Sequence, residues 1–235
     1  VGTSGAGMVR IEKTGTALPG RQAPPQTLTV QNGLPSDFVR RLLPDGSGMW
    51  IGTTVGLAYF DGQKSIALDE THEPWPVRDL LSDSQGGLWM VNKEQGLVHY
   101  QRHQVIEKSG ELPWQMVRFP DARNPTPAPL WSMTQDAHGR LWLGATSAVF
   151  VFDGTTFQRW PAAGLSNTDR IVQLLFDDAQ QIWFRSDEAI GCLNFRDGTP
   201  AWSLLKIPRI AWLQATPQRE ILAASESGLY RLRAP

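Results

Sequence analysis

A repeat centred on tryptophan is the feature that most constrains how this 235-residue chain can fold. Four copies carry an apolar residue on each side of the tryptophan, and they lie at residues 48–53, 87–92, 140–145 and 181–186. A weaker copy at residues 220–225 has Ile221 near the tryptophan position. Successive copies are 39, 53, 41 and 38 residues apart, and a period of about 40 is typical of propeller blades and of some helical arrays.

Short apolar segments on either side of each copy favour strands over helices. A segment of four to six residues precedes each copy, and turn residues such as Asp and Gly separate the two. A further short apolar segment follows, as in residues 56–62 and 149–154. Runs this short, interrupted by Gly, Asp and Pro, match antiparallel strands. The five preceding segments are Val39–Leu43, Val77–Leu81, Leu130–Met133, Ile171–Phe176 and Ile210–Leu213.

The repeat therefore predicts an all-β fold, a β-propeller built of four-stranded antiparallel blades. Each blade would consist of an inner strand, the tryptophan strand, a third strand and an outer strand, and it would pack on two neighbours so that both faces are apolar. Gly52 and Gly144 would let adjacent sheets approach closely. We expect about six units, of which the first lacks its inner strand and the last lacks its outer strand. The partial units span residues 1–30 and 207–235, and the full units span about 33–72, 73–110, 128–162 and 165–206.

The incomplete first and last units leave the extent of the array open. The chain is either a single propeller domain over residues 1–235 or part of a larger array of blades. It starts at Val1 and not at a methionine, so we expect it to be a piece of a larger protein. An uncovered end blade exposes a strand edge and apolar surface, and we therefore expect another chain or further sequence to cover it.

Composition excludes several classes of protein. Lys and Arg total 22 and Asp and Glu total 23, so the chain lacks the excess positive charge of a nucleic-acid-binding surface. The single cysteine, Cys192, allows neither an intrachain disulfide nor a cysteine-based zinc site, and we expect it to serve as a small apolar residue. No apolar run approaches the roughly 20 residues of a membrane-spanning helix and no leader is present, so we predict no direct membrane insertion by this chain.

Side chains that could carry catalysis are scattered along the chain. The four histidines follow no metal-binding pattern, and we predict that His99 and His103 form an exposed polar pair at a strand end. We predict no catalytic residue, no metal site and no cofactor, and hence no enzymatic activity in this chain. Four aspartates precede turn residues, where their side chains would cap backbone N–H groups: Asp45, Asp83, Asp136 and Asp177.

Candidate ligand-binding residues lie where the loops of a propeller gather on one face. These loops lead into each inner strand or join the second strand to the third, and binding residues are commonly placed on loops. Flat apolar rings beside arginine suit a small molecule such as a carbohydrate or an aromatic anion. Near the starts of inner strands lie Trp75, Trp131 and Trp212, with Arg78, Arg170 and Arg209 at similar places. The alternative is packing of these tryptophans between blades, as we predict for the repeat residues Trp50, Trp89, Trp142 and Trp183.

An insertion at residues 111–129 falls within the longest interval of the repeat. It contains Trp114, a further candidate ligand-binding residue, together with Arg118, Arg123 and a proline-rich run. A lid or a partner-binding loop is one interpretation of the insertion, and an ordinary surface excursion stiffened by proline is the other.

The repeat resembles that of the two-component regulator propeller family. The resemblance rests on residues 33–39 (GLPSDFV), 45–53 (DGSGMWIGT) and 56–62 (GLAYFDG), and on residues 164–167 (GLSN), which lead into another inner strand. The chain departs from the family pattern at a turn glycine, at a strand glycine and at the last tryptophan. The residues at these places are Gln180 and Gln181, Arg185, and Ile221.

The resemblance implies a periplasmic ligand-sensing domain of a bacterial receptor anchored in the inner membrane. Such propellers act as input domains, and their outputs are commonly histidine kinases, including hybrids, or diguanylate cyclases. The motifs of those outputs do not occur in this chain. The resemblance implies a ligand and the receptor's own downstream signalling domain as partners. The uncovered end blades separately allow a homodimer as an alternative.

Two other functions stay open at this point. A propeller enzyme of the streptogramin-lyase type would need a histidine and acidic residues, with a divalent metal, near the propeller axis. An interaction scaffold would grip a protein partner through the apolar end blades or through the proline-rich run.

Overall fold

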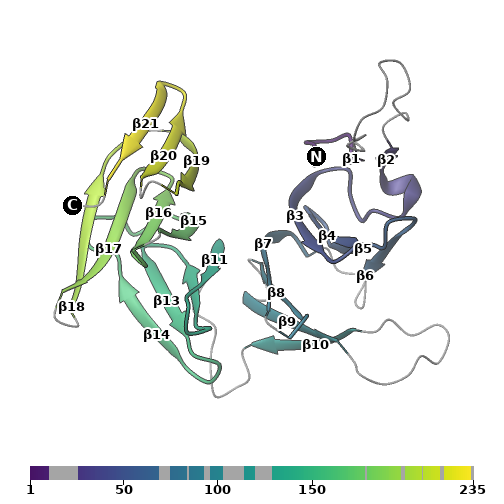
Figure 1. The fold of residues 1–235 in the computed structure, drawn as a ribbon, viewed down its shortest axis with the longest axis horizontal. Coiled ribbons are helices and arrows are strands. Elements are labelled where there is room, and N and C mark those ends of the chain that lie inside the picture. The colour runs from purple at the N-terminus through teal and green to yellow at the C-terminus, as the bar shows by residue number, and fades with distance from the viewer. Residues whose placement is uncertain are drawn as a thin grey trace. The chain divides into compact units, whose positions relative to one another are not determined.

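The computed structural model describes most of the chain, and most of what it describes is β-strand. The described residues contain 21 strands and one short 3-10 helix, Val30–Asn32. The chain divides into two compact units, one formed by residues 1–94 and 98–117 and the other by residues 95–97 and 118–235 (Figure 1). The described residues are 1–10, 26–68, 75–83, 85–92, 96–102, 114–119, 129–177, 179–196, 199–207, 209–217 and 220–233.

The N-terminal unit contains a two-stranded sheet and two four-stranded sheets. In the two-stranded sheet, β1 (Met8–Arg10) pairs with β2 (Gln26–Leu28). The first four-stranded sheet consists of β3 (Val39–Asp45), β4 (Gly48–Thr53), β5 (Leu57–Phe60) and β6 (Ser65–Leu68). The second consists of β7 (Val77–Ser82), β8 (Leu88–Asn92), β9 (Gly96–Arg102) and β10 (Trp114–Phe119).

The C-terminal unit contains two four-stranded sheets and a three-stranded sheet. The first consists of β11 (Ser132–Gln135), β12 (Leu141–Gly144), β13 (Ala148–Phe152) and β14 (Phe157–Pro161). The second consists of β15 (Ile171–Phe176), β16 (Ile182–Ser186), β17 (Ile190–Arg196) and β18 (Thr199–Leu205). The third consists of β19 (Ile210–Ala215), β20 (Ile221–Ser225) and β21 (Gly228–Leu232).

Each sheet keeps the order of the chain, so that every strand pairs with the next one along the sequence. The five predicted inner strands are β3, β7, β11, β15 and β19. This arrangement confirms the predicted all-β fold of antiparallel blades. Within the described residues the first repeat unit, β1–β2, has no inner strand, and the last repeat unit, β19–β21, has no outer strand, as the repeat predicted.

The repeat tryptophans lie on the second strands, and three of them, Trp50, Trp142 and Trp183, pack against the inner strand of the following sheet. Trp50, Trp142 and Trp183 are 2–5% exposed, and Trp89 is half-buried. Trp142 belongs to one hydrophobic cluster with Ile171 of the next sheet's inner strand. A meander of four strands cannot bury both of its faces alone, so within each unit neighbouring sheets stabilise one another through their apolar side chains.

The strand register corrects the position of the weakest repeat copy. The last two sheets are offset by 39 residues, because Ile171 and Ile210 take the same place in their inner strands. By this offset Leu222 matches Trp183, whereas the sequence comparison had placed Ile221 near that position. The tryptophan position of the last sheet is therefore occupied by a leucine one residue further on.

The structure also corrects the interpretation of the insertion at residues 111–129. Residues 114–119 form β10, the outer strand of its sheet, and thus belong to the blade and not to a loop. Of the rest of the insertion, only Pro129 is among the described residues. The predicted end of this repeat unit near residue 110 therefore falls before its outer strand, β10.

Neighbouring sheets approach closely at the glycines of the second strands, as predicted. A Cβ atom on Gly52 would lie 2.6 Å from Cγ1 of Val77 on the next sheet. Arg185 occupies the equivalent position in β16, and its Nη1 donates a hydrogen bond to the carbonyl oxygen of Ile210 at 2.8 Å. A long side chain therefore reaches the next sheet at the place where β4 and β12 have a glycine.

Inner strands link neighbouring sheets through polar side chains. In the N-terminal unit, Nε of Arg41 donates to Oδ1 of Asp79 on the next inner strand at 2.9 Å. In the C-terminal unit, Nε2 of Gln173 donates to the carbonyl oxygen of Leu213 at 2.7 Å, and the Leu213 amide donates to Oε1 of Gln173 at 3.0 Å. Arg41 and Gln173 each follow a register shift in their own inner strand, and such bulges redirect side chains.

Aspartates cap the turns between the first and second strands. Oδ1 of Asp136 accepts from the backbone amides of His138 and Arg140, each at 2.9 Å, and its Oδ2 accepts from Nε1 of Trp142 at 3.0 Å. Asp177 makes the equivalent bonds, including one from Nε1 of its own repeat tryptophan. The prediction is confirmed for these two residues.

The other two aspartates, Asp83 and Asp45, make different contacts from those of Asp136 and Asp177. Asp83 caps its turn through Oδ1, but its Oδ2 pairs with His99, whose ring stacks on Trp89 at 3.9 Å between ring centres. Burial raises the pKa of Asp83, yet hydrogen bonds from the Gly87 amide and from His99 outweigh it and leave this pKa below its ordinary value. The prediction of an exposed pair is wrong for His99, which is buried, and His103 lies outside the described residues. Asp45 is the last residue of β3 and pairs with Gly48.

Gln180 adopts a backbone conformation that favours glycine, with a φ of 59°. Gly86 and Gly139 occupy the same place in the equivalent turns, with φ values of 77° and 82°. Because a side chain costs roughly 1–2 kcal/mol in this region, Gln180→Gly should raise the free energy of unfolding by about 0.5–1 kcal/mol. Urea denaturation would measure the change, with Gly139→Gln as the reverse substitution. Equal or lower stability of Gln180→Gly would contradict this interpretation of the turn.

Candidate ligand-binding site

Two of the predicted ligand-binding residues meet in the C-terminal unit. Trp131 directly precedes β11 and Arg170 directly precedes β15, so the loops into two neighbouring inner strands bring them together. The guanidinium carbon of Arg170 lies 4.9 Å from the ring centre of Trp131, within the range of cation–π attraction. Nε1 of Trp131 donates to Oγ1 of Thr146 at 3.2 Å, and Thr146 forms a backbone bridge with Arg170. Thr146 lies between β12 and β13, on the second kind of loop predicted to carry a ligand.

Asp187, on the loop between β16 and β17, holds Arg170 through two hydrogen bonds. Nε of Arg170 lies 2.6 Å from Oδ2 of Asp187, and Nη2 lies 3.0 Å from Oδ1. Hydrogen bonding to Asp187 raises the pKa of Arg170. Paired contacts between a guanidinium group and a carboxylate fix the orientation of both groups.

A buried carboxylate fixes the loop that carries Asp187. Asp169 accepts a hydrogen bond from Oγ of Ser186 at 2.8 Å and one from the Asp187 amide at 2.9 Å. The backbone carbonyl of Asp169 also accepts from the amide of Ser147, which has a φ of 52°. The arginine, the acid and the tryptophan are therefore held in place before any ligand arrives, which lowers the entropic cost of binding.

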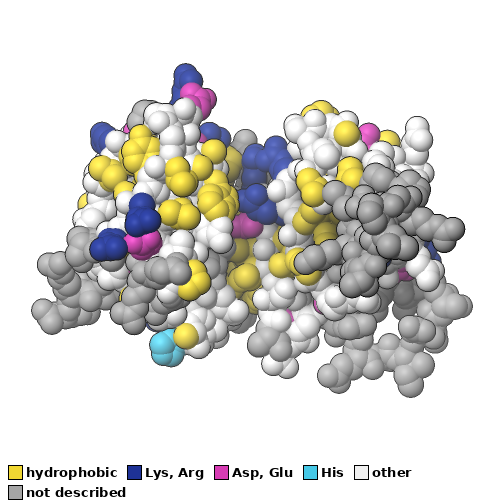
Figure 2. All heavy atoms as spheres, turned by 45° about the horizontal axis from the view of Figure 1, so that its top comes forward, with side chains coloured by type: hydrophobic (Ala, Val, Ile, Leu, Met, Phe, Trp, Pro, Cys, Tyr) yellow, Lys and Arg dark blue, Asp and Glu magenta, His cyan; other side chains and the backbone are white. Residues whose placement is uncertain are grey.

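The arginine–acid pair recurs on the next sheet. Arg209 directly precedes β19, and its Nη1 lies 2.7 Å from Oε2 of Glu226 on the loop between β20 and β21. In both pairs the partners are 17 residues apart. In the first four-stranded sheet the same two positions hold Phe38, which is exposed, and Thr54, which is half-buried. Figure 2 shows one face of the molecule, on which exposed hydrophobic side chains lie beside small groups of opposite charges.

The cluster of Trp131, Arg170 and Asp187 offers an aromatic ring, N–H donors and carboxylate acceptors at one place. Because Asp187 already neutralises Arg170, an anionic ligand would gain little there. A hydroxyl group can accept from Arg170 and donate to Asp187, and a sugar ring can lie against an indole. The chemistry therefore favours a neutral, polyhydroxylated ligand over an aromatic anion.

The other four predicted ligand-binding residues lie elsewhere. Trp75 is buried in a hydrophobic cluster of the N-terminal unit, and Arg78 is half-buried on β7. Trp212 is 43% exposed on β19. Trp114 begins β10, and its side chain lies outside the described residues. The structure thus brings together Trp131 and Arg170 and places Arg209 at the equivalent position on the following sheet.

Two residues of the cluster, Thr146 and Asp187, lie on loops between second and third strands that the sequence places on the candidate face, but neither was predicted as an individual ligand-binding residue. The available signal was the repeated spacing of 17 residues between an arginine before an inner strand and an acid beyond the second strand. That signal becomes visible only when the second strands are aligned in the correct register.

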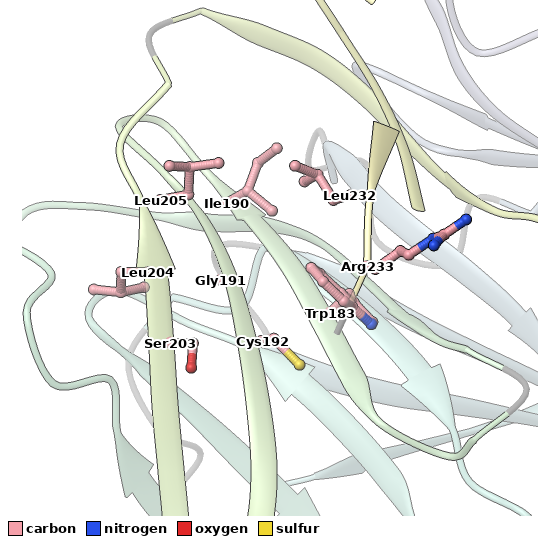
Figure 3. A pocket seen from close by; sticks show the side chains of 9 residues that line it. All are labelled: Trp183, Ile190, Gly191, Cys192, Ser203, Leu204, Leu205, Leu232 and Arg233. Atoms are coloured by element: carbon pink, nitrogen blue, oxygen red, sulfur yellow. The ribbon is translucent and has the colours of Figure 1, made fainter. Parts of the chain in front are cut away.

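Two hollows of the described structure lie beside the incomplete sheets. One, of about 160 Å³, lies between β17, β18 and β21 and is lined mostly by apolar side chains (Figure 3). The other, of about 230 Å³, lies in the N-terminal unit between residues of β1, β4 and β5. Cys192 lines the first hollow, and burial raises its pKa to about 12, which keeps the thiol neutral.

Two searches of the described ranges gave negative findings. They contain no group of three or more His, Cys, Asp or Glu side chains that could hold a metal ion. They also contain no helix with the length and apolar character needed to cross a membrane.

Comparison with solved structures identifies the fold as a β-propeller. The extracellular domain of BT3049 from B. thetaiotaomicron, assigned to a hybrid two-component system, matches 99% of this chain with a TM-score of 0.70 and 18% identity. The extracellular domain of BT4673 from the same organism, assigned to a one-component system, matches 98% with a TM-score of 0.65 and 17% identity. A streptogramin B lyase matches 86% of this chain and 70% of its own, with a TM-score of 0.57 and 11% identity.

The two extracellular domains are much longer than this chain, which covers 32% of the first and 30% of the second. Neither a family model nor a curated protein sequence matches the chain. The class defined by fold and comparison is therefore the β-propeller, and the similarity of this chain to the extracellular domains of BT3049 and BT4673 extends over nearly its whole length.

Proposed function

We propose that this chain is an extracytoplasmic ligand-sensing domain of a bacterial membrane receptor. The observation that carries the proposal is the likeness of 99% of the chain to the extracellular domain of a hybrid two-component system. The resemblance of the repeat to the two-component regulator propeller supports the same role. The receptor would lie in the inner membrane with this domain in the periplasm, and its kinase or cyclase output would lie outside residues 1–235.

In this role the cluster of Trp131, Arg170 and Asp187 binds the ligand, and the chain itself does not catalyse a reaction. The ligand is a small neutral molecule rich in hydroxyl groups, such as a carbohydrate. Binding would change how this domain packs on its downstream neighbour, by no more than the difference in ligand affinity between the two receptor states. The streptogramin-lyase likeness makes metal-dependent cleavage the outcome that would argue for an enzyme instead.

The double substitution Trp131→Ala and Arg170→Ala should weaken ligand binding at least about tenfold. The reason is that it removes the stacking surface and the charged hydrogen-bond donor together, each worth on the order of 1 kcal/mol. Titration calorimetry of the intact receptor with a panel of neutral oligosaccharides would measure this loss, and a receptor-driven reporter gene would follow the response.

Arg159→Ala is the matched control for this experiment, since Arg159 is an exposed arginine on the outer strand β14. Its affinity and response should equal those of the unchanged receptor. An unaltered response in the double variant would remove the cluster as the binding site. A response to no member of the panel, together with metal-dependent turnover, would overturn the sensing role.

A further inference from the structure

The last, three-stranded sheet exposes a large apolar side chain at a position that the four-stranded sheets β3–β6, β11–β14 and β15–β18 bury. Leu229 on β21 is 69% exposed. Its equivalents on the third strands of other sheets are 0–2% exposed: Leu57, Val149 and Ile190. Each of these equivalents packs against the inner strand of the following sheet, as Ile190 does in one cluster with Ile210 and Leu213. The environment of Leu229 therefore lacks the neighbour that its repeat position has elsewhere.

Trp212, on the inner strand β19, is a second side chain that is exposed at a position of contact between sheets. It takes the place that Gln173 has in the preceding sheet, and Gln173 reaches across to Leu213 through two hydrogen bonds. Trp212 is instead 43% exposed. Two side chains on one face of the last sheet thus occupy positions that contact a following sheet in β3–β6, β11–β14 and β15–β18.

The edge of the last sheet is open as well. Among the described residues β21 pairs only with β20, whereas the third strand of every four-stranded sheet pairs with an outer strand. Figure 3 shows Leu232 and Arg233 on one side of an apolar hollow, and Ile190 and Leu205 on the other. Exposed strand edges beside apolar grooves favour pairing with a further strand.

The preceding sheet shows what fills such a hollow. There the outer strand β18 places Trp202 and Leu204 in a hydrophobic cluster with residues of the neighbouring sheet β11–β14. Trp202 also meets Phe184 of its own sheet edge-to-face, at 5.6 Å between ring centres. Trp202 pairs with Leu193, which is the equivalent of Leu232 by the 39-residue offset of these sheets. A fourth strand beside β21 would bring two side chains into the hollow in the same way.

We propose that β19–β21 is an internal blade, completed by polypeptide of the same protein C-terminal to Pro235. This polypeptide supplies a fourth strand at the edge of β21 and then a further blade on the face that bears Trp212 and Leu229. The side chains 39 positions beyond Trp202 and Leu204 are large and apolar. The length of the matching extracellular domains, about three times that of this chain, agrees with a continued array.

Two other occupants fit the observations less well. A second copy that paired through β21 would cover the edge and leave the face with Trp212 and Leu229 in water. The two-stranded sheet β1–β2 has no inner strand among the described residues, and inner strands supply the contacts at the sheet interfaces described above, as Ile210 and Leu213 do. Continuation of the repeat covers both the edge and the face. The proposal does not depend on the proposed sensing function.

Thiol labelling of the intact protein, made from its natural reading frame, tests whether the face is covered. Leu229→Cys should react at least about tenfold more slowly than Val55→Cys, because a buried thiol reacts only through local opening. Val55 is the matched control, since it is 42% exposed on a loop in the N-terminal unit. Cys192 contributes little background because it is buried and its thiol stays neutral. Equal labelling rates at the two positions overturn the proposal.

A photoreactive benzoylphenylalanine in place of Leu229 identifies the occupant. In the intact protein we expect its adducts on peptides C-terminal to Pro235. Adducts on residues 1–30 or on a second copy would assign another occupant and overturn the proposal, as would slow labelling without any adduct. Neither experiment involves the loop cluster, so their outcomes are separate from the test of ligand binding.

Discussion

Replacing Trp142 with alanine is expected to lower the free energy of unfolding by about 3–5 kcal/mol, the usual cost of deleting a buried aromatic side chain. Trp142 is buried between two sheets, where its ring meets Phe176 edge-to-face at 6.1 Å between ring centres. Its indole nitrogen also donates to Asp136. The substitution thus removes an interface contact and a turn contact together.

Urea denaturation would measure this loss, and Trp142→Phe is the matched variant. Phenylalanine keeps an aromatic ring in the interface and loses the hydrogen bond to Asp136, so we expect it to cost about 1–2 kcal/mol. A loss under about 1 kcal/mol in the alanine variant would show that the repeat tryptophan is not a core residue of the interface.

The second large effect is expected for Asp136→Ala, which should cost about 2–4 kcal/mol. The substitution removes two backbone caps and leaves the indole N–H of Trp142 without its carboxylate acceptor. Asp45→Ala is the natural control, because Asp45 ends β3 and pairs with Gly48 in a shorter turn. We expect it to change stability by less than about 0.5 kcal/mol.

The stabilisation by Asp136 should also depend on pH. Burial raises the pKa of Asp136, but hydrogen bonds from Trp142 and Arg140 outweigh it and hold this pKa below the ordinary value of 3.8. A carboxylate with a lowered pKa stabilises the folded state above the ordinary value, and this contribution is lost as the pH falls through the folded-state pKa. The difference between the unchanged protein and Asp136→Ala should thus be constant near neutral pH and shrink below about pH 4. A difference that grows on acidification would contradict the assignment.

Much of the fold could be predicted because its signals are local. The apolar run before each tryptophan and the Asp–Gly turns recur within a few residues of one another, so they define the inner and second strands directly. The outer strands vary more, and β10 was missed because the interval that contains it is unusually long. The exception at Asp45 was visible in the spacing, since Trp50 follows Asp45 by five positions and Trp142 follows Asp136 by six.

The candidate site could be predicted only in part. Trp131 and Arg170 were found because both lie beside the start of an inner strand, where loops of neighbouring blades gather. The loop of Asp187 was placed on the same face, but its pairing with Arg170 was not predicted, because that contact depends on how two strands and two loops align in space. His99 was misassigned for the same reason, as its partner Asp83 lies on a turn that precedes it by a full strand.

Amide hydrogen exchange resolved strand by strand tests the equivalence of the sheets most directly. If each tryptophan strand is the second strand of a four-stranded blade, β12, β13, β16 and β17 should exchange slowest in the C-terminal unit. The outer strands β14 and β18, each paired along one edge only among the described residues, should exchange at least about tenfold faster, and the pattern should repeat in β3–β6. Protection that bears no relation to the order of strands within the sheets would contradict the account.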